Sequence, residues 1–231
     1  MTPQIAQEIL DKIVGQVFGY KNPLTLEVFM QKYAFDVRLP QQVNDSTTGE
    51  VTWAGSTSPT KFITMANARK RSEEEDLMPT RPLPDIQSIL TAWNETNYMS
   101  TERQVESINV YESDNITMSE NIYRSQFVVN SKNILFSDGC HNDEFLAASQ
   151  RSQTSTFSIK VDDSQNVTNS FFITWCNKVN NSFFVNDCFD LTDCMFCTNL
   201  AGKQYCIANM QYDEVEYKRI KDMVVRWILT S

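Results

Sequence analysis

The sequence predicts a mainly β protein built around a parallel β-helix, a solenoid of about nine coils of 12 residues each. Three observations predict it. From residue 107 to 208 almost every third residue is small or aliphatic, and every twelfth residue from Tyr111 is apolar. All seven prolines lie before residue 85. We predict an N-terminal attachment region of helices and an extended arm (1–106), the β-helix (107–212) and a C-terminal capping helix (213–231).

The three-residue period alternates serine with aliphatic residues, as in Ser107, Val110, Ser113 and Ile116, and the phase of this alternation swaps near residues 149–161. Free helices and flat strands have periods of 3.6 and 2, so neither explains the pattern. A thin coil that sends every third residue into a narrow bore does explain it, because small residues must alternate with large ones there. Nine coils about 4.8 Å apart would span roughly 40 Å.

The row that starts at Tyr111 sets the coil length. Its members are Tyr111, Tyr123, Leu135, Ala147, Ile159, Phe171, Phe183, Met195 and Ile207. The row midway between them, from Thr117 to Ala201, is mostly polar, so the repeat is 12 rather than 6. A triangular coil of about 18 residues would mix the two rows and ranks second. Proline is excluded from these coils because each coil must donate backbone hydrogen bonds to the next.

Two helices are predicted near the N-terminus. Thr2 precedes Pro3 as a helix cap, and a second helix begins at Thr25. Their apolar faces comprise Ile5, Ile9, Ile13 and Val17 in the first helix and Leu26, Phe29, Met30 and Tyr33 in the second. A proline-rich linker spans 79–84, and Asp85 caps a short helix that carries Ile86, Ile89, Leu90 and Trp93.

A C-terminal helix is predicted after Asp213, which has Glu216 three residues later in the spacing of a capping box. Its apolar side comprises Tyr217, Ile220, Val224, Val225 and Ile228. Open ends of a β-helix expose unpaired strand edges, so we expect this helix to cover the last coil.

The apolar row points outward and forms a long stripe with the phenylalanines beside it. Monomeric proteins rarely expose such a stripe. Either the N-terminal segments lie over it or it is an interface between chains, and we favour the interface. The predicted interface residues are Tyr111, Tyr123, Leu135, Phe171, Phe172, Phe183, Phe184, Met195 and Phe196.

Composition argues against several classes of function. The formal charge of −9 disfavours nucleic-acid binding, and the basic residues 69–71 are followed by the acids Glu73, Glu74, Glu75 and Asp76. No apolar run is long enough to cross a membrane. The acids Glu8 and Asp11 predict that the N-terminus is not a secretory signal. A single histidine leaves little material for acid–base chemistry, so we expect a non-enzymatic protein without a cofactor.

The cysteines leave a metal site as an alternative. Cys188, Cys194, Cys197 and Cys206 with Asp193 are potential zinc ligands. All four thiols, however, fall in the inward phase of the repeat, where cysteine acts as a small apolar residue. We therefore expect reduced, buried thiols and no bound metal.

Two resemblances accompany these patterns. The small or cysteine residue at every third position of a 12-residue coil resembles the beetle antifreeze proteins, over residues 107–208 and in architecture alone, because the Thr-x-Thr ladder of an ice-binding face is absent. The segment Gly202-Lys-Gln-Tyr-Cys-Ile-Ala-Asn-Met-Gln-Tyr-Asp-Glu-Val-Glu-Tyr217 resembles the end of uncharacterised cysteine-rich repeat proteins of phages and reduced-genome bacteria, with Met210 where their pattern has lysine. That resemblance implies no biochemical activity.

The favoured hypothesis is a structural protein of a homo-oligomer or larger assembly, located in a virion or in the cytoplasm. A phage capsid decoration, fibre or tail-associated protein attached by its N-terminal region fits this hypothesis. The first alternative is a carbohydrate-binding or polysaccharide-acting β-helix, which predicts a cleft with carboxylates or exposed aromatic rings on the polar face. The second alternative is a metal-binding module.

Overall fold

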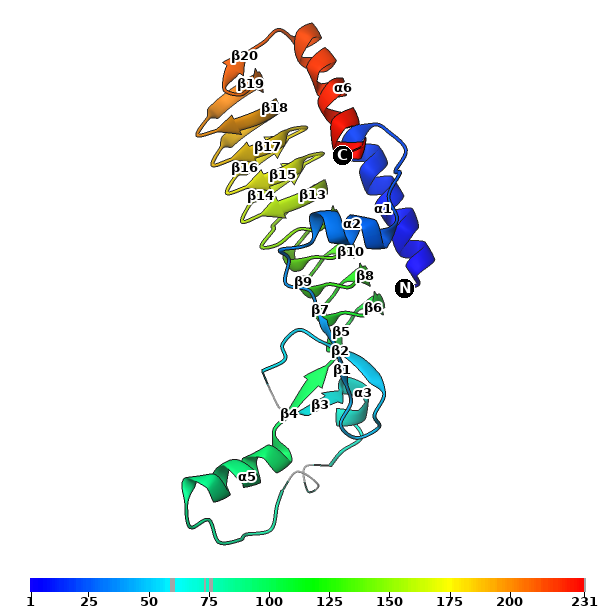
Figure 1. Ribbon diagram of the computed structural model, residues 1–231, viewed down its shortest axis with the longest axis vertical. Coiled ribbons are helices and arrows are strands. Elements are labelled where there is room, and N and C mark those ends of the chain that lie inside the picture. The colour runs from blue at the N-terminus through cyan, green and yellow to red at the C-terminus, as the bar shows by residue number, and fades with distance from the viewer. Residues whose placement is uncertain (59–60, 73, 75–76, 231) are drawn as a thin grey trace.

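The computed structural model shows a parallel β-solenoid of about nine turns with N-terminal helices and a C-terminal helix, so the predicted fold class is confirmed (Figure 1). It describes residues 1–58, 61–72, 74 and 77–230. Pro59, three acids of the charged run (Glu73, Glu75 and Asp76) and Ser231 lie outside the described residues.

The strands of successive turns pair in parallel and form two sheets. The larger sheet contains β6 (Ile108–Tyr111), β8 (Glu120–Tyr123), β10 (Lys132–Leu135), β12 (Glu144–Ala147), β13 (Thr156–Asp162), β14 (Gln165–Thr168), β15 (Phe171–Thr174), β16 (Asn177–Asn180), β17 (Phe183–Asn186), β18 (Phe189–Thr198) and β19 (Ala201–Ile207). The smaller sheet contains β5 (Gln104–Val105), β7 (Asp114–Thr117), β9 (Gln126–Val129) and β11 (Asp138–His141). Pairing partners are 12 residues apart throughout, as in Ile122 with Ile134, which confirms the predicted coil length.

The backbone turns at every third residue. From Glu106 to Ala208 each such residue has a left-handed conformation, with φ between 45° and 61° at the non-glycine positions. Asparagine tolerates this region better than most residues. It occupies ten of these positions: 109, 115, 121, 130, 133, 142, 166, 169, 181 and 199. Proline, with φ near −65°, cannot adopt this conformation, which adds a second reason for its absence from the coils.

Inward serines join consecutive turns at the corners. The Ser125 hydroxyl donates to the Tyr123 carbonyl oxygen at 2.9 Å and accepts from the Ser137 backbone N–H at 3.0 Å, one turn later. Cysteine replaces serine further along: the Cys176 thiol contacts the Thr174 carbonyl at 3.1 Å and accepts from the Cys188 N–H at 3.3 Å. The corner residue therefore satisfies backbone groups of two turns with one side chain.

At the predicted swap of phase, the serine hydroxyls move from one set of corners to another. Ser149 and Ser155 end two serine rows, because the residues that donate to them one turn later are Val161 and Val167. Ser158 begins a new row at the neighbouring inward position and accepts from the Ser170 N–H. The strands move with the corners, and β13 spans the change as a strand of seven residues.

Three helices lie along one side of the stack: α1 (Pro3–Phe18), α2 (Leu26–Tyr33) and α6 (Glu214–Thr230) (Figure 1). The predicted caps are confirmed. Thr2 accepts from the Ile5 N–H at 3.3 Å, Thr25 accepts from Val28 at 3.4 Å and Asp213 accepts from Glu216 at 2.9 Å.

The last coil ends differently from the prediction. Helix α6 runs beside the stack and buries Tyr217, Val224, Val225 and Ile228 against its apolar side, so the prediction that it covers the open end was wrong (Figure 1). The chain instead folds back as β20 (Met210–Gln211), which pairs antiparallel with β19. The apolar row offers this helix far more surface to bury than the thin end of the last coil does.

An arm extends from the first coil. It comprises β1 (Gln41–Asn44), β2 (Val51–Ala54), β3 (Lys61–Thr64), α3 (Met65–Ala68), α5 (Ile86–Thr96) and β4 (Tyr98–Thr101). Arg103 Nε and Nη2 donate to the buried Asp114 carboxylate at 3.0 and 2.8 Å, and the Gly55 N–H donates to it at 2.9 Å. A Cβ at Gly55 would lie 2.4 Å from Oε1 of the buried Gln126, so a larger residue at the joint would displace this side chain.

Ser137→Ala should lower the free energy of unfolding by about 1–3 kcal/mol, because the Ser149 N–H loses the acceptor that lies 3.1 Å away. Urea denaturation followed by circular dichroism measures the change. Ser137→Cys is the matched control and should cost much less, since Cys176 and Cys188 already make the same contacts. Equal losses for the two variants would contradict the role assigned to this side chain.

Candidate functional site

The apolar row is covered by helices of the same chain. Tyr123, Leu135, Phe171, Phe183 and Met195 are each at most 2% exposed. The prediction that these residues form an interface between chains was therefore wrong, and the alternative, cover by the chain itself, is the arrangement observed. The first helix supplies much of the cover. Its Phe18 ring lies 5.3 Å from the ring of Phe171 and 5.6 Å from that of Phe183.

The other predicted interface residues lie at the margins of this cover. Phe172 and Phe196 are exposed, while Phe184 and Tyr111 are half-buried. The rings of Phe184 and Phe196 stack 4.8 Å apart, and that of Phe184 lies 6.0 Å from the Trp227 ring of α6. These contacts close most of the stripe and leave only a narrow edge in solvent.

The six cysteines are buried and unpaired. Burial raises the pKa of the Cys176 thiol to about 11, and burial also raises the pKa of Cys140. The thiols of Cys176 and Cys140 therefore remain protonated at neutral pH and react slowly. In the part of the chain that the structure describes, no three His, Cys, Asp or Glu side chains are grouped as metal ligands, so the zinc alternative has no assembled ligand set.

Asp143 is a carboxylate inside the bore. It occupies a serine position of the row between Ser131 and Ser155 and is 2% exposed. The Ser155 N–H donates to it at 2.7 Å and the His141 N–H at 2.9 Å. Burial raises the pKa of this carboxyl to about 6, against the opposing effect of these hydrogen bonds. His141 itself is exposed, while Cys140 is buried, so the two side chains point to opposite sides of the strand.

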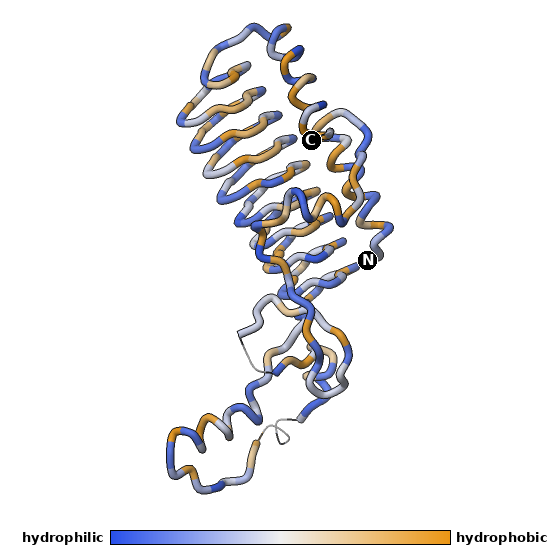
Figure 2. The backbone as a smooth tube through the Cα atoms, viewed as in Figure 1, coloured by the Kyte–Doolittle hydropathy of each residue, from blue (hydrophilic) through white to orange (hydrophobic). Residues whose placement is uncertain are grey.

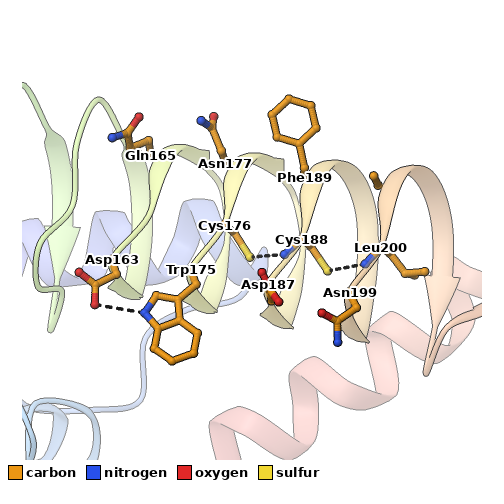
Figure 3. Close-up of a pocket in the computed structure, with 11 residues that line it drawn as sticks. Asp163, Gln165, Trp175, Cys176, Asn177, Asp187, Cys188, Phe189, Asn199 and Leu200 are labelled. Carbon is orange, nitrogen blue, oxygen red and sulfur yellow. Dashed lines mark hydrogen bonds between the residues drawn. The ribbon is translucent and has the colours of Figure 1, made fainter.

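A shallow groove of about 660 Å³ lies on the face opposite the helices (Figure 3). Its floor is the inward row Cys176, Cys188 and Leu200. Two rows of side chains flank this floor: Asp163, Trp175, Asp187 and Asn199 on one side, and Gln165, Asn177, Phe189 and Ala201 on the other. The groove follows the axis of the solenoid, because each row takes one residue from each turn.

Two aromatic rings are exposed on this polar face. Trp175 is 63% exposed and Phe189 is 48% exposed. Trp175 Nε1 donates to the Asp163 carboxylate at 3.3 Å, and Arg151 Nε donates to the same carboxylate at 2.6 Å. The hydrogen bond with Arg151 holds the pKa of Asp163 below its usual range. These two hydrogen bonds hold the edge of the Trp175 indole, and the face of the ring remains in solvent.

Helix α5 is a second exposed apolar surface. None of its residues is buried, and it lies at the far end of the arm (Figure 2). Ile86, Ile89, Leu90 and Trp93 are 40–70% exposed. An adjoining groove of about 400 Å³ is lined by Met78, Pro79, Leu83, Ile89 and Trp93. The predicted cap is present, since the Ser88 N–H donates to Asp85 at 2.8 Å.

No family model, no curated protein and no solved structure matches this chain. Among the helices that the structure describes, none is long and apolar enough to cross a membrane.

The sequence contained a signal for the groove that the predictions missed. In the last turns Trp175 stands in a row with Asp163, Asp187 and Asn199, and Phe189 stands in a row with Gln165 and Asn177. A large aromatic residue among polar neighbours in such a row predicts an exposed ring. The sequence therefore indicates that Trp175 and Phe189 are exposed, although it does not show that a groove lies between them.

Asp143→Ser should raise the free energy of unfolding near pH 7.5 by up to about 3 kcal/mol, because it removes a buried carboxylate and restores the serine row. The folded-state pKa of about 6 lies above the ordinary 3.8, so the folded protein binds the proton more tightly. The wild-type protein therefore loses stability as pH rises from about 4 to about 6.

The variant lacks this pH dependence, so the difference in the free energy of unfolding between the two proteins should shrink towards pH 4. Urea midpoints measured for both proteins between pH 4 and 8 test this expectation, because the other titrating groups are common to both. A difference that stays constant over this range would contradict the assignment of the titration to Asp143.

Proposed function

We propose that the protein is a non-enzymatic structural component that joins a homo-oligomer or larger particle through its N-terminal arm. The observation that carries the proposal is the exposed apolar side of α5. Monomeric proteins seldom leave such a surface in solvent, and its place at the tip of an arm makes it available to a partner.

The partner that we propose for α5 is the same helix of a second copy. An amphipathic helix is self-complementary across a twofold axis, which is the commonest symmetry of homo-oligomers. The adjoining groove lies next to the apolar side of the helix, so two arms can each insert a ring such as Trp93 beside Leu83 and Met78 of the other. The covered apolar row leaves the arm as the main unburied apolar surface in the described part of the chain.

The proposed location of this structural component is a virion. The resemblance of the C-terminal segment to phage repeat proteins favours a capsid decoration, fibre or tail-associated protein over a free cytoplasmic one. A solenoid suits these roles because continuous backbone ladders make it stiff along its axis.

Replacing Leu90 and Trp93 together by Glu should reduce the mass in solution to that of the 26.6 kDa monomer. Charges on the apolar side would be buried without partners in the dimer, whereas they lie in water in the monomer. Size-exclusion chromatography with light scattering measures the mass, and circular dichroism should remain unchanged because α5 buries no residue in its own chain.

Val215→Glu is the matched control, since Val215 is an 80% exposed apolar residue on α6, away from the arm. It should leave the mass unchanged. A wild-type protein that is monomeric at high concentration, or a double variant that keeps the wild-type oligomer, would overturn the proposal.

A further inference from the structure

We propose that the groove between Trp175 and Phe189 binds a neutral, extended polysaccharide chain. The site is separate from the arm, because it lies on the polar face of the last turns (Figure 3). The proposal is independent of the assembly proposed above, and its test has a separate readout.

The aromatic residues supply the apolar half of the recognition. The face of a pyranose ring presents C–H groups, which pack against an aromatic ring, while the hydroxyls project from its edge. Trp175 and Phe189 come from successive turns and lie on opposite sides of the floor. Successive turns are about 4.8 Å apart, a spacing comparable to one sugar unit of an extended chain.

The indole of Trp175 is positioned before any ligand binds. Asp163 holds its Nε1–H, and Arg151 holds Asp163. The 63% exposure of Trp175 leaves the ring in contact with solvent. An aromatic ring that is both exposed and held in place is typical of a binding surface rather than of a core.

The polar residues supply the other half. Asp187 and Asn199 flank the floor on the Trp175 side, and Gln165 and Asn177 flank it on the other. Carboxylate oxygens accept hydrogen bonds, and amides both donate and accept, so together they match the hydroxyls of a sugar. Among the described residues that line the groove there is no lysine or arginine. The cations beside it are engaged, Arg151 with Asp163 and Lys178 with the Phe189 ring at 5.3 Å, which disfavours an anionic polysaccharide or a nucleic acid.

A proline-rich peptide is the main competitor, because such peptides also dock on aromatic grooves. It offers carbonyl acceptors but few donors. The Trp175 Nε1–H, which would donate to such a carbonyl, already donates to Asp163, and the exposed Asp187 carboxylate can only accept hydrogen bonds. Sugar hydroxyls provide these donors, so the groove favours the polysaccharide.

The test is a titration of the full chain with cellohexaose and mannohexaose, two neutral β-1,4-linked oligosaccharides, by isothermal calorimetry. We expect saturable binding, and Trp175→Ala should weaken it at least tenfold. Asp163→Ala should weaken it to a smaller extent, because the indole is retained but no longer fixed. Circular dichroism and urea midpoints of both variants establish that they fold.

Trp93→Ala is the matched control, since Trp93 is 57% exposed but lies on the arm. It should leave the affinity for the oligosaccharides unchanged, just as Trp175→Ala should leave the mass in solution unchanged. Absence of binding to both oligosaccharides, binding that Trp175→Ala does not weaken, or tighter binding of a decaproline peptide in the same groove would each overturn the proposal.

Discussion

The bridging of turns by one small inward side chain is the interaction on which the rest of the solenoid depends. At most corners a serine hydroxyl or cysteine thiol contacts a carbonyl of its own turn and accepts an N–H from the next, as Ser125 does between Tyr123 and Ser137. A larger side chain would fill the bore, and an alanine would leave a buried N–H without an acceptor. The left-handed residue before each corner completes the turn, so the repeat requires neither glycine nor proline.

The change of corners near residue 155 shapes the surface as well as the core. Phe127 and Val129 belong to one strand, β9, in the first half, whereas the equivalent residues of the second half, Asp163 and Gln165, lie on either side of a corner. The side chains that flank a corner splay apart and expose the floor between them (Figure 3). The groove lined by Trp175 and Phe189 thus follows from the shift of the serine rows.

The sequence predicted what its periodicity encodes and little beyond it. The coil length, the phase swap and the helix caps at Thr2, Thr25 and Asp213 depend on local patterns of residue type, and the structure confirms them. The left-handed backbone conformation at every third residue could not be predicted, because the side chains at these positions are too varied to form a pattern. The choice between cover by the chain itself and an interface between chains could not be made from the sequence either, because the periodicity of Phe171 and Phe183 does not show which segment packs on them.

The cover of that row by α1 and α6 also determines where the molecule can interact. Burial of Phe171 and Phe183 beneath Phe18 removes the longest apolar surface from solvent and adds the helices to the rod. Two exposed features then remain far apart: the apolar side of α5 on the arm before the first turn, and the aromatic groove on the last turns. About five turns lie between the arm and the start of the groove at Asp163, roughly 24 Å of stiff rod. A rod of this kind suits a protein that is held at one end and presents a binding surface at the other.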